Sequence, residues 1–183
     1  MRTKVDMFQA LASENPIELA RGKSYRGSVE TGDIFALHIV NHGWILGRVI
    51  FKNPSMFPGE QEGGFEDTFL IYLYSGIYPN KPTSVSLPIL PELILPPLVV
   101  DDELWSLGVA SQVTKSEIGK DEILKKHCFF HFPTEKFHDE YGVVCKKPVK
   151  PCGPSSLMLV SGLEKYLDRS LRDGFDQNNH PLN

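Results

Sequence analysis

Residues 32–51 read GDIFALHIVNHGWILGRVIF, and this stretch decides the fold class. Residues 34–40 place apolar side chains on both faces of a strand. The apolar pattern resumes at residues 44–51 after the short link Asn41-His42-Gly43, which is typical of a β-hairpin. Gly47 inside the second run predicts a sharp bend or the close approach of another backbone. Because small barrels curl through such bent strands, the stretch predicts an antiparallel, bent or barrel-like sheet.

The segments around this hairpin predict further strands and one helix. Residues 68–76 (TFLIYLYSG) are rich in aromatic and branched side chains and predict a strand. Residues 87–100 contain four prolines, which cannot donate to a ladder, so we expect edge strands and extended segments there. Ser161 and Glu164 have the spacing of a capping box, and Gly174 follows where a helix would end. The apolar face of this C-terminal amphipathic helix consists of Leu163, Tyr166, Leu167 and Leu171.

The pattern as a whole belongs to the α+β class, mainly antiparallel β, with the C-terminal helix packed on the sheet. A chain of 183 residues suits one domain with a sizeable core. We expect residues 1–22 to be an N-terminal extension with the spacing of a short helix. Residues 23–174 are then a single β-rich domain, and residues 175–183 a mobile tail.

Charge and composition narrow the classes of function. The formal net charge of −4 argues against a protein that tracks nucleic-acid phosphates, because such a protein needs a basic face. No apolar run is long enough to span a bilayer, and Asp6, Gln9 and Ser13 interrupt what would be the apolar part of a signal peptide. We therefore expect a cytoplasmic protein. Its three cysteines, an odd number, are then expected to be reduced thiols.

One cluster of residues has a metal-ligand spacing. His127, Cys128 and His131 could share a helical face and bind zinc, with Cys145 and Cys152 completing the set. The segment lacks both the glutamate of HExxH and a CxxC pair, so we predict no metal and no cofactor. No nucleophile elbow or glycine-rich phosphate loop accompanies the thiols either. A Cys- or zinc-dependent hydrolase is the more remote alternative, and the expected protein is not an enzyme.

Two acidic segments are candidates for binding a partner. They lie in polar loops, where carboxylates are usually solvated, whereas acid–base catalysis needs one of two carboxylates to be desolvated. An acidic rim that attracts a basic protein is the better reading, because such charge steers association. The candidate residues are Glu60, Glu62, Glu66 and Asp67 in the first segment and Asp101, Asp102 and Glu103 in the second.

Trp44 and Arg48 stand on the same side of the second hairpin strand. In one reading both belong to the scaffold, with the aliphatic part of Arg48 lying over the sheet. In the other reading they form a cation–π pair that lines a ligand groove. The second reading would make the protein a small-ligand or peptide-binding barrel module.

The sequences YRGSVETGDIFALHI (25–39), GWILGRVIF (43–51) and TFLIYLY (68–74) resemble a known family. This is the immunity protein 26 family of bacterial polymorphic toxin systems, whose members open with a Gly-Asp strand and a Gly-Arg-Val strand and later carry a Trp followed by a Gly. The resemblance covers residues 23–172. The matching positions are Gly32, Asp33, Phe35 and Ala36, then Gly47, Arg48 and Val49, and finally Trp105 and Gly108.

The resemblance implies a cytoplasmic bacterial protein that binds a cognate toxin domain and neutralises it by occlusion. It implies no catalysis and no cofactor. From the net charge and the short apolar runs, we expect no direct contact with nucleic acid and no membrane association. A nuclease toxin would suit the acidic segments, because its substrate groove is basic. The sequence is compatible with a monomer or a dimer.

Overall fold

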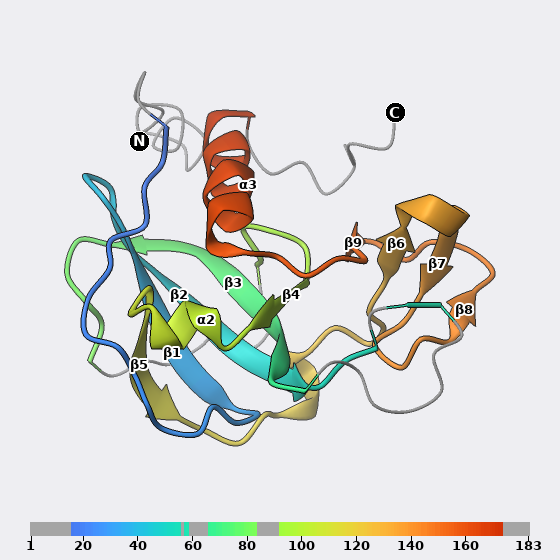
Figure 1. The fold of residues 1–183 in the computed structure, drawn as a ribbon, viewed down its shortest axis with the longest axis horizontal. Helices are drawn as coiled ribbons and strands as arrows, with labels where there is room; N and C mark the ends of the chain where they lie inside the picture. Colours follow the sequence, from blue (N-terminus) through green and yellow to red (C-terminus); the bar gives the residue numbers. More distant parts are fainter. Residues whose placement is uncertain (1–15, 56, 59–65, 84–91, 174–183) are drawn as a thin grey trace.

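The computed structural model describes residues 16–55, 57–58, 66–83 and 92–173, and it has two sheets and a C-terminal helix (Figure 1). The large sheet contains β1 (Asp33–Ile39), β2 (Gly43–Lys52), β3 (Thr68–Tyr78), β4 (Leu98–Asp101) and β5 (Ala110–Lys115). Their order is β4-β3-β2-β1-β5, and every neighbouring pair is antiparallel. The prediction of an α+β fold with mainly antiparallel strands is therefore confirmed.

The hairpin of β1 and β2 forms where the sequence predicts it. His38 pairs with Trp44, and Ile34 pairs with Arg48. Asn41 has a φ of 64° and Gly43 a φ of 115°, which are conformations that these two residue types tolerate best. The polar link therefore turns the chain at low conformational cost.

The large sheet bends but does not close. Its ladders shift register between Ile34 and Phe35, between Ile45 and Gly47, and between Val49 and Phe51. Such irregularities increase local twist. β4 and β5 are the two edges of this open sheet in the part of the chain that the structure describes. The edge position of β4 agrees with the proline-rich sequence that precedes it; residues 84–91 of that stretch lie outside the described residues.

One face of the large sheet carries the larger apolar core. The helix α3 (Val160–Asp173) packs there through Leu163, Leu167 and Leu171, as the sequence predicts. Figure 1 shows this helix lying over the sheet. The short helix α2 (Glu103–Ser106) adds Trp105, whose ring meets those of Phe35 and Phe69, with both centroid separations at 5.2 Å.

The predicted capping box at the start of α3 is wrong. The helix begins at Val160, so Ser161 lies within its first turn. The Glu164 carboxylate instead accepts the backbone N–H of Leu19 at 2.9 Å. Leu19 and Ile17 are buried in the main core, so the folded unit begins before residue 23. Residues 1–15 and 174–183, including Gly174 and the expected tail, lie outside the described residues.

The opposite face of the large sheet is covered by the segment that follows β5. This segment contains the 3-10 turns η1 (Lys120–Glu122) and η2 (Phe132–Thr134) and a small sheet. Its strands are β6 (Phe129–His131), β7 (Lys136–His138), β8 (Val144–Cys145) and β9 (Gly153–Pro154), in the order β8-β7-β6-β9. β9 runs parallel to β6. None of the helices described is long and apolar enough to cross a membrane.

We expect Gly47→Ala to destabilise the protein by about 1 to 3 kcal/mol, because a methyl group there overpacks the core. The added carbon would overlap the ring of Phe35, which also packs against Trp105, and would lie 2.8 Å from Leu73 Cδ2. Urea denaturation measures the free energy of unfolding. The control is Gly76→Ala, whose added carbon meets Tyr78 at an ordinary 3.4 Å. Equal stability of the two variants would contradict this account of Gly47.

Candidate functional site

The pairing of β3 with β4 brings two acidic segments to one end of the large sheet. Thr68, the first residue of β3, pairs with Asp101, the last residue of β4. The residues just before β3 therefore lie at the same end as those just after β4. We call this surface the acidic end, and it comprises Glu66, Asp67, Asp101, Asp102 and Glu103. Glu60 and Glu62 lie outside the described residues.

The carboxylates of the acidic end are open to solvent, with one exception. Glu66, Asp67, Asp102 and Glu103 are exposed, and Asp101 is half-buried. Burial raises the pKa of Asp101, and the negative charge of Asp102 raises it further. Asp101 also accepts the backbone N–H of Glu103 at 3.1 Å, which fixes the chain at the start of α2. The acidic end therefore concentrates negative charge on a well-ordered strand pair.

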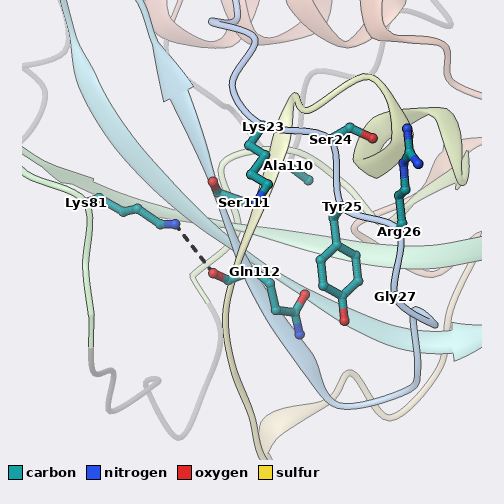
Figure 2. A pocket seen from close by; sticks show the side chains of 9 residues that line it. All are labelled: Lys23, Ser24, Tyr25, Arg26, Gly27, Lys81, Ala110, Ser111 and Gln112. Carbon is teal, nitrogen blue, oxygen red and sulfur yellow. Dashed lines mark hydrogen bonds between the residues drawn. The ribbon is translucent and has the colours of Figure 1, made fainter.

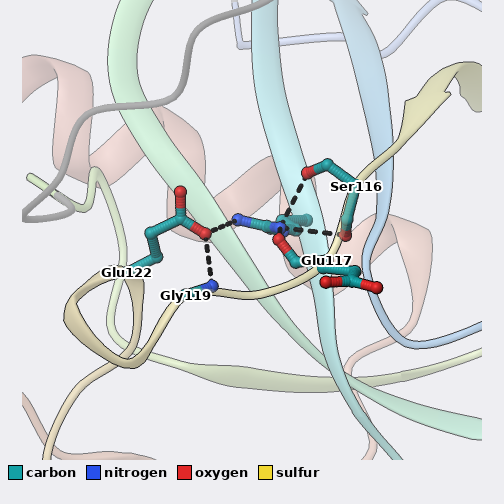
Figure 3. A network of polar contacts seen from close by, with 5 residues as sticks. Ser116, Glu117, Gly119 and Glu122 are labelled. Carbon is teal, nitrogen blue, oxygen red and sulfur yellow. Dashed lines mark hydrogen bonds and ion pairs between the residues drawn. The ribbon is translucent and has the colours of Figure 1, made fainter.

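Arg48 does not line a groove, which corrects one of the two readings from the sequence. Its side chain is fully buried, with an exposed fraction of 0%. The guanidinium donates to the Glu122 carboxylate at 2.8 Å, to both oxygens of Ser116 at 2.8 and 3.0 Å, and to the Glu117 carbonyl at 2.7 Å (Figure 3). The segment after β5, which covers this face of the sheet, thus holds Arg48 in the protein interior. This agrees with the reading in which Arg48 belongs to the scaffold.

Trp44 has a different cationic neighbour from the one the sequence suggested. It is half-buried and stacks on His38 with 4.6 Å between ring centroids. The Lys81 ammonium lies 6.0 Å from the indole centroid. This separation is at the outer limit of a cation–π contact. Trp44 and Lys81 therefore form the aromatic and cationic pair that was expected of Trp44 and Arg48.

Lys81 also borders a surface hollow of about 750 Å³ (Figure 2). Its ammonium reaches the Gln112 carbonyl of β5 at 3.5 Å. The opposite wall is the segment of residues 23–27. The lining residues are Lys23, Ser24, Tyr25, Arg26, Gly27, Lys81, Ala110, Ser111 and Gln112. Sequence reasoning missed this hollow, because residues 21–25 had only the pattern of a basic connector and Lys81 stood in a turn.

The histidines and thiols of residues 127–131 do not form a metal site in the structure. Residues 129–131 are a strand, so the spacing of His127 and His131 does not place them on one helical face. No group of three His, Cys, Asp or Glu side chains in the described ranges could hold a metal ion. His131 instead bonds the Thr134 hydroxyl at 2.8 Å.

His127 takes part in a buried polar chain. Its Nε2 lies 2.5 Å from the Tyr72 hydroxyl, and its Nδ1 lies 2.9 Å from the Glu140 carboxylate. Burial would raise the pKa of Glu140, but the hydrogen bond and charge of His127 outweigh it and leave this pKa lowered. The Tyr72 hydroxyl also accepts the Leu124 N–H at 3.1 Å. These polar contacts therefore join β3 to the segment after β5 that covers the sheet, and their role is structural.

Comparison of the chain with protein-family models, with curated proteins and with solved structures gives no match. The functional argument therefore rests on the residues of this chain.

We expect Glu122→Gln to lower the free energy of unfolding by about 1 to 2 kcal/mol at neutral pH, because Arg48 would keep its burial and lose its counter-charge. The Gly119 N–H and the Arg48 guanidinium hold the pKa of Glu122 below its ordinary value. A lowered folded-state pKa gives stability that is present above the ordinary carboxyl pKa and lost as pH falls through the lowered one.

The stability difference between the wild type and Glu122→Gln should therefore shrink at about pH 3, as urea denaturation at the two pH values can show. Glu117→Gln is the matched control, because Glu117 binds Arg48 only through its main-chain carbonyl. A difference that stays constant with pH, or that Glu117→Gln reproduces, would rule out the ion pair as its source.

Proposed function

We propose that this protein is an immunity protein that binds a cognate toxin domain and neutralises it by occlusion, without catalysis. The observation that carries the proposal is the acidic end, where the register of β3 and β4 gathers two separate acidic segments. The resemblance of residues 23–172 to the immunity protein 26 family supports the same function. The proposed place of action is the cytoplasm, and the proposed partner is a protein.

The acidic end has the physical properties of a docking surface for a basic partner. Negative charge on one surface accelerates encounter with a positive one and suppresses binding in other orientations. The strands behind it are rigid, because Phe69, Leu70, Val99 and Val100 are buried. A preorganised surface loses little conformational entropy on binding. A toxin with a basic groove for nucleic acid, such as a nuclease, is the partner that best matches these properties.

The experiment that tests the proposal is growth rescue. A candidate toxin domain chosen from the genes next to this one is expressed in a sensitive bacterium with and without the protein. Rescue together with co-purification of the pair supports the proposal, and the mass of the complex gives its stoichiometry. Growth arrest that persists while the protein is abundant and folded contradicts the proposal for that toxin.

Reversing two charges at the acidic end should weaken the complex. We expect the double variant Asp102→Lys, Glu103→Lys to raise Kd by about 10- to 100-fold at low salt, because both exposed carboxylates would then repel a basic partner. Titration calorimetry measures the affinity, and growth rescue should fall with it. The salt dependence of Kd should also become shallower.

Glu18→Lys is the matched control for the single variant Glu103→Lys, because each reverses one exposed charge. Glu18 is exposed, and its carbonyl accepts the N–H of Val40, which follows β1. It therefore lies at the end of the sheet opposite Asp33 and the start of β3. If Glu18→Lys weakens binding as much as Glu103→Lys, net charge rather than the acidic end determines affinity.

A second candidate function is the binding of an anionic small molecule or an acidic peptide in the hollow. The observation that favours it is that Lys23, Arg26 and Lys81 all line one hollow. The Gln112 side-chain oxygen, on the same wall, is buried with no hydrogen-bond partner in the described part of the chain. A ligand with both negative charge and a donor group would satisfy these residues.

We expect pyrophosphate or a tetraglutamate peptide to change the tryptophan emission in a saturable manner if the hollow is a binding site. Trp44 lies beside Lys81 while Trp105 is buried, so the change would report on Trp44. Lys81→Gln should raise the apparent Kd by about tenfold. Lys165→Gln on α3 is the control. If the emission shows no saturable response, or if both variants lose affinity equally, the hollow is excluded as the binding site for these ligands.

A further inference from the structure

The small sheet places two of the three cysteines opposite each other. Cys128 directly precedes Phe129 of β6, and Cys152 directly precedes Gly153 of β9. Phe129 and Gly153 are partners in the parallel ladder, and the Gly153 N–H donates to the Cys128 carbonyl at 2.8 Å. The register of the two strands therefore aligns the two thiols.

The two sulfur atoms are in contact. Cys128 Sγ and Cys152 Sγ are 2.7 Å apart, and both side chains are buried, with exposed fractions of 0% and 5%. Because the two sulfurs are already in contact beside the ladder pair of Phe129 and Gly153, little movement is needed to join them covalently. Neither thiol is needed for the proposed acidic end.

The surroundings activate one of the two thiols. The contact between the two thiols lowers the pKa of Cys128 and raises that of Cys152. Burial opposes the first of these pKa shifts and adds to the second. A thiolate is the attacking species in thiol–disulfide exchange. Cys145 is half-buried, and its own pKa is raised, mainly by burial and then by the charge of Cys128. The contact between the two sulfurs therefore favours a thiolate in this pair, and we assign the attack to Cys128.

We infer that Cys128 and Cys152 are an oxidisable pair that closes to a disulfide and joins β6 covalently to β9. The oxidant is a small-molecule disulfide of the glutathione type. The Cys128 thiolate attacks one of its sulfurs and releases the first glutathione thiolate, which takes up the proton of Cys152. The Cys152 sulfur then attacks the mixed disulfide at Cys128 and releases the second glutathione thiolate, which takes up the proton that Cys128 lost to solvent when it ionised. Overall the protein dithiol loses two protons and two electrons, and one glutathione disulfide becomes two thiols.

The bond would act on the segment that leads into α3. β9 is a two-residue strand at the edge of the small sheet, so local opening there can admit the oxidant. Cys152 lies only a few residues before Val160, where α3 begins. The two cysteines are 24 residues apart, and closing a loop of this length restricts the unfolded chain. We expect the oxidised protein to unfold at a Tm about 5 to 10 °C higher.

The test uses the reduced full-length protein incubated with graded mixtures of reduced and oxidised glutathione. After acid quenching and unfolding, alkylation counts the remaining thiols, and mass spectrometry finds the cross-linked peptides. The expected result is the loss of two thiols and of the mass of two hydrogens, with Cys128 linked to Cys152 and Cys145 alkylated. Three alkylated thiols at the most oxidising ratio, a stable glutathione adduct alone, or a bond through Cys145 would overturn the inference.

Two variants separate the bond from its structural surroundings. Cys145→Ser should keep both the cross-link and the rise in Tm on oxidation, whereas Cys152→Ser should lose both while remaining folded by circular dichroism. A rise in Tm that persists in Cys152→Ser contradicts the inference. If that variant does not fold, the peptide mapping of the wild type decides the matter. The toxin-binding proposal is tested by rescue and does not depend on this result.

Discussion

A buried charge on the central strand β2 constrains the rest of the structure. The Arg48 guanidinium has no contact with solvent, so it must find its counter-charge and acceptors within the protein. Ser116, Glu117 and Glu122 supply them, and all three belong to the segment that leaves the edge strand β5. This requirement holds the segment across the second face of the large sheet and leads the chain to the small sheet. Together with the polar chain of Tyr72, His127 and Glu140, this ion pair holds the segment on the large sheet.

The parts of the fold that follow from local pattern could be predicted from the sequence. The hairpin, β3 and α3 each have a periodicity that one short window contains. The small sheet could not be predicted, because its strands are two or three residues long and the parallel pairing of β6 with β9 is non-local. The capping box was wrong for a related reason. Its spacing is local, but the partner that Glu164 binds, Leu19, is 145 residues away.

The candidate site shows the same division between local and long-range information. Each acidic segment is visible in the sequence, but their meeting depends on the pairing of Thr68 with Asp101. The prediction of a groove at Arg48 was wrong, because nothing near Arg48 in the sequence indicates that residues 116–122 cover its side chain. The hollow was missed because its walls come from residues 23–27, Lys81 and β5, and none of these has a motif on its own.

The acidic end and the cationic segment of residues 23–27 meet at α2. The Tyr25 N–H donates to the Trp105 carbonyl at 3.1 Å, and Trp105 stands two residues after Glu103. The net charge of −4 does not show that carboxylates and cations lie next to each other at this place. A partner that matches both signs can dock in only one orientation, because turning it would bring like charges together. For the proposed complex, specificity for one toxin then comes from the order of charges around α2, and the total charge contributes mainly to the rate of encounter.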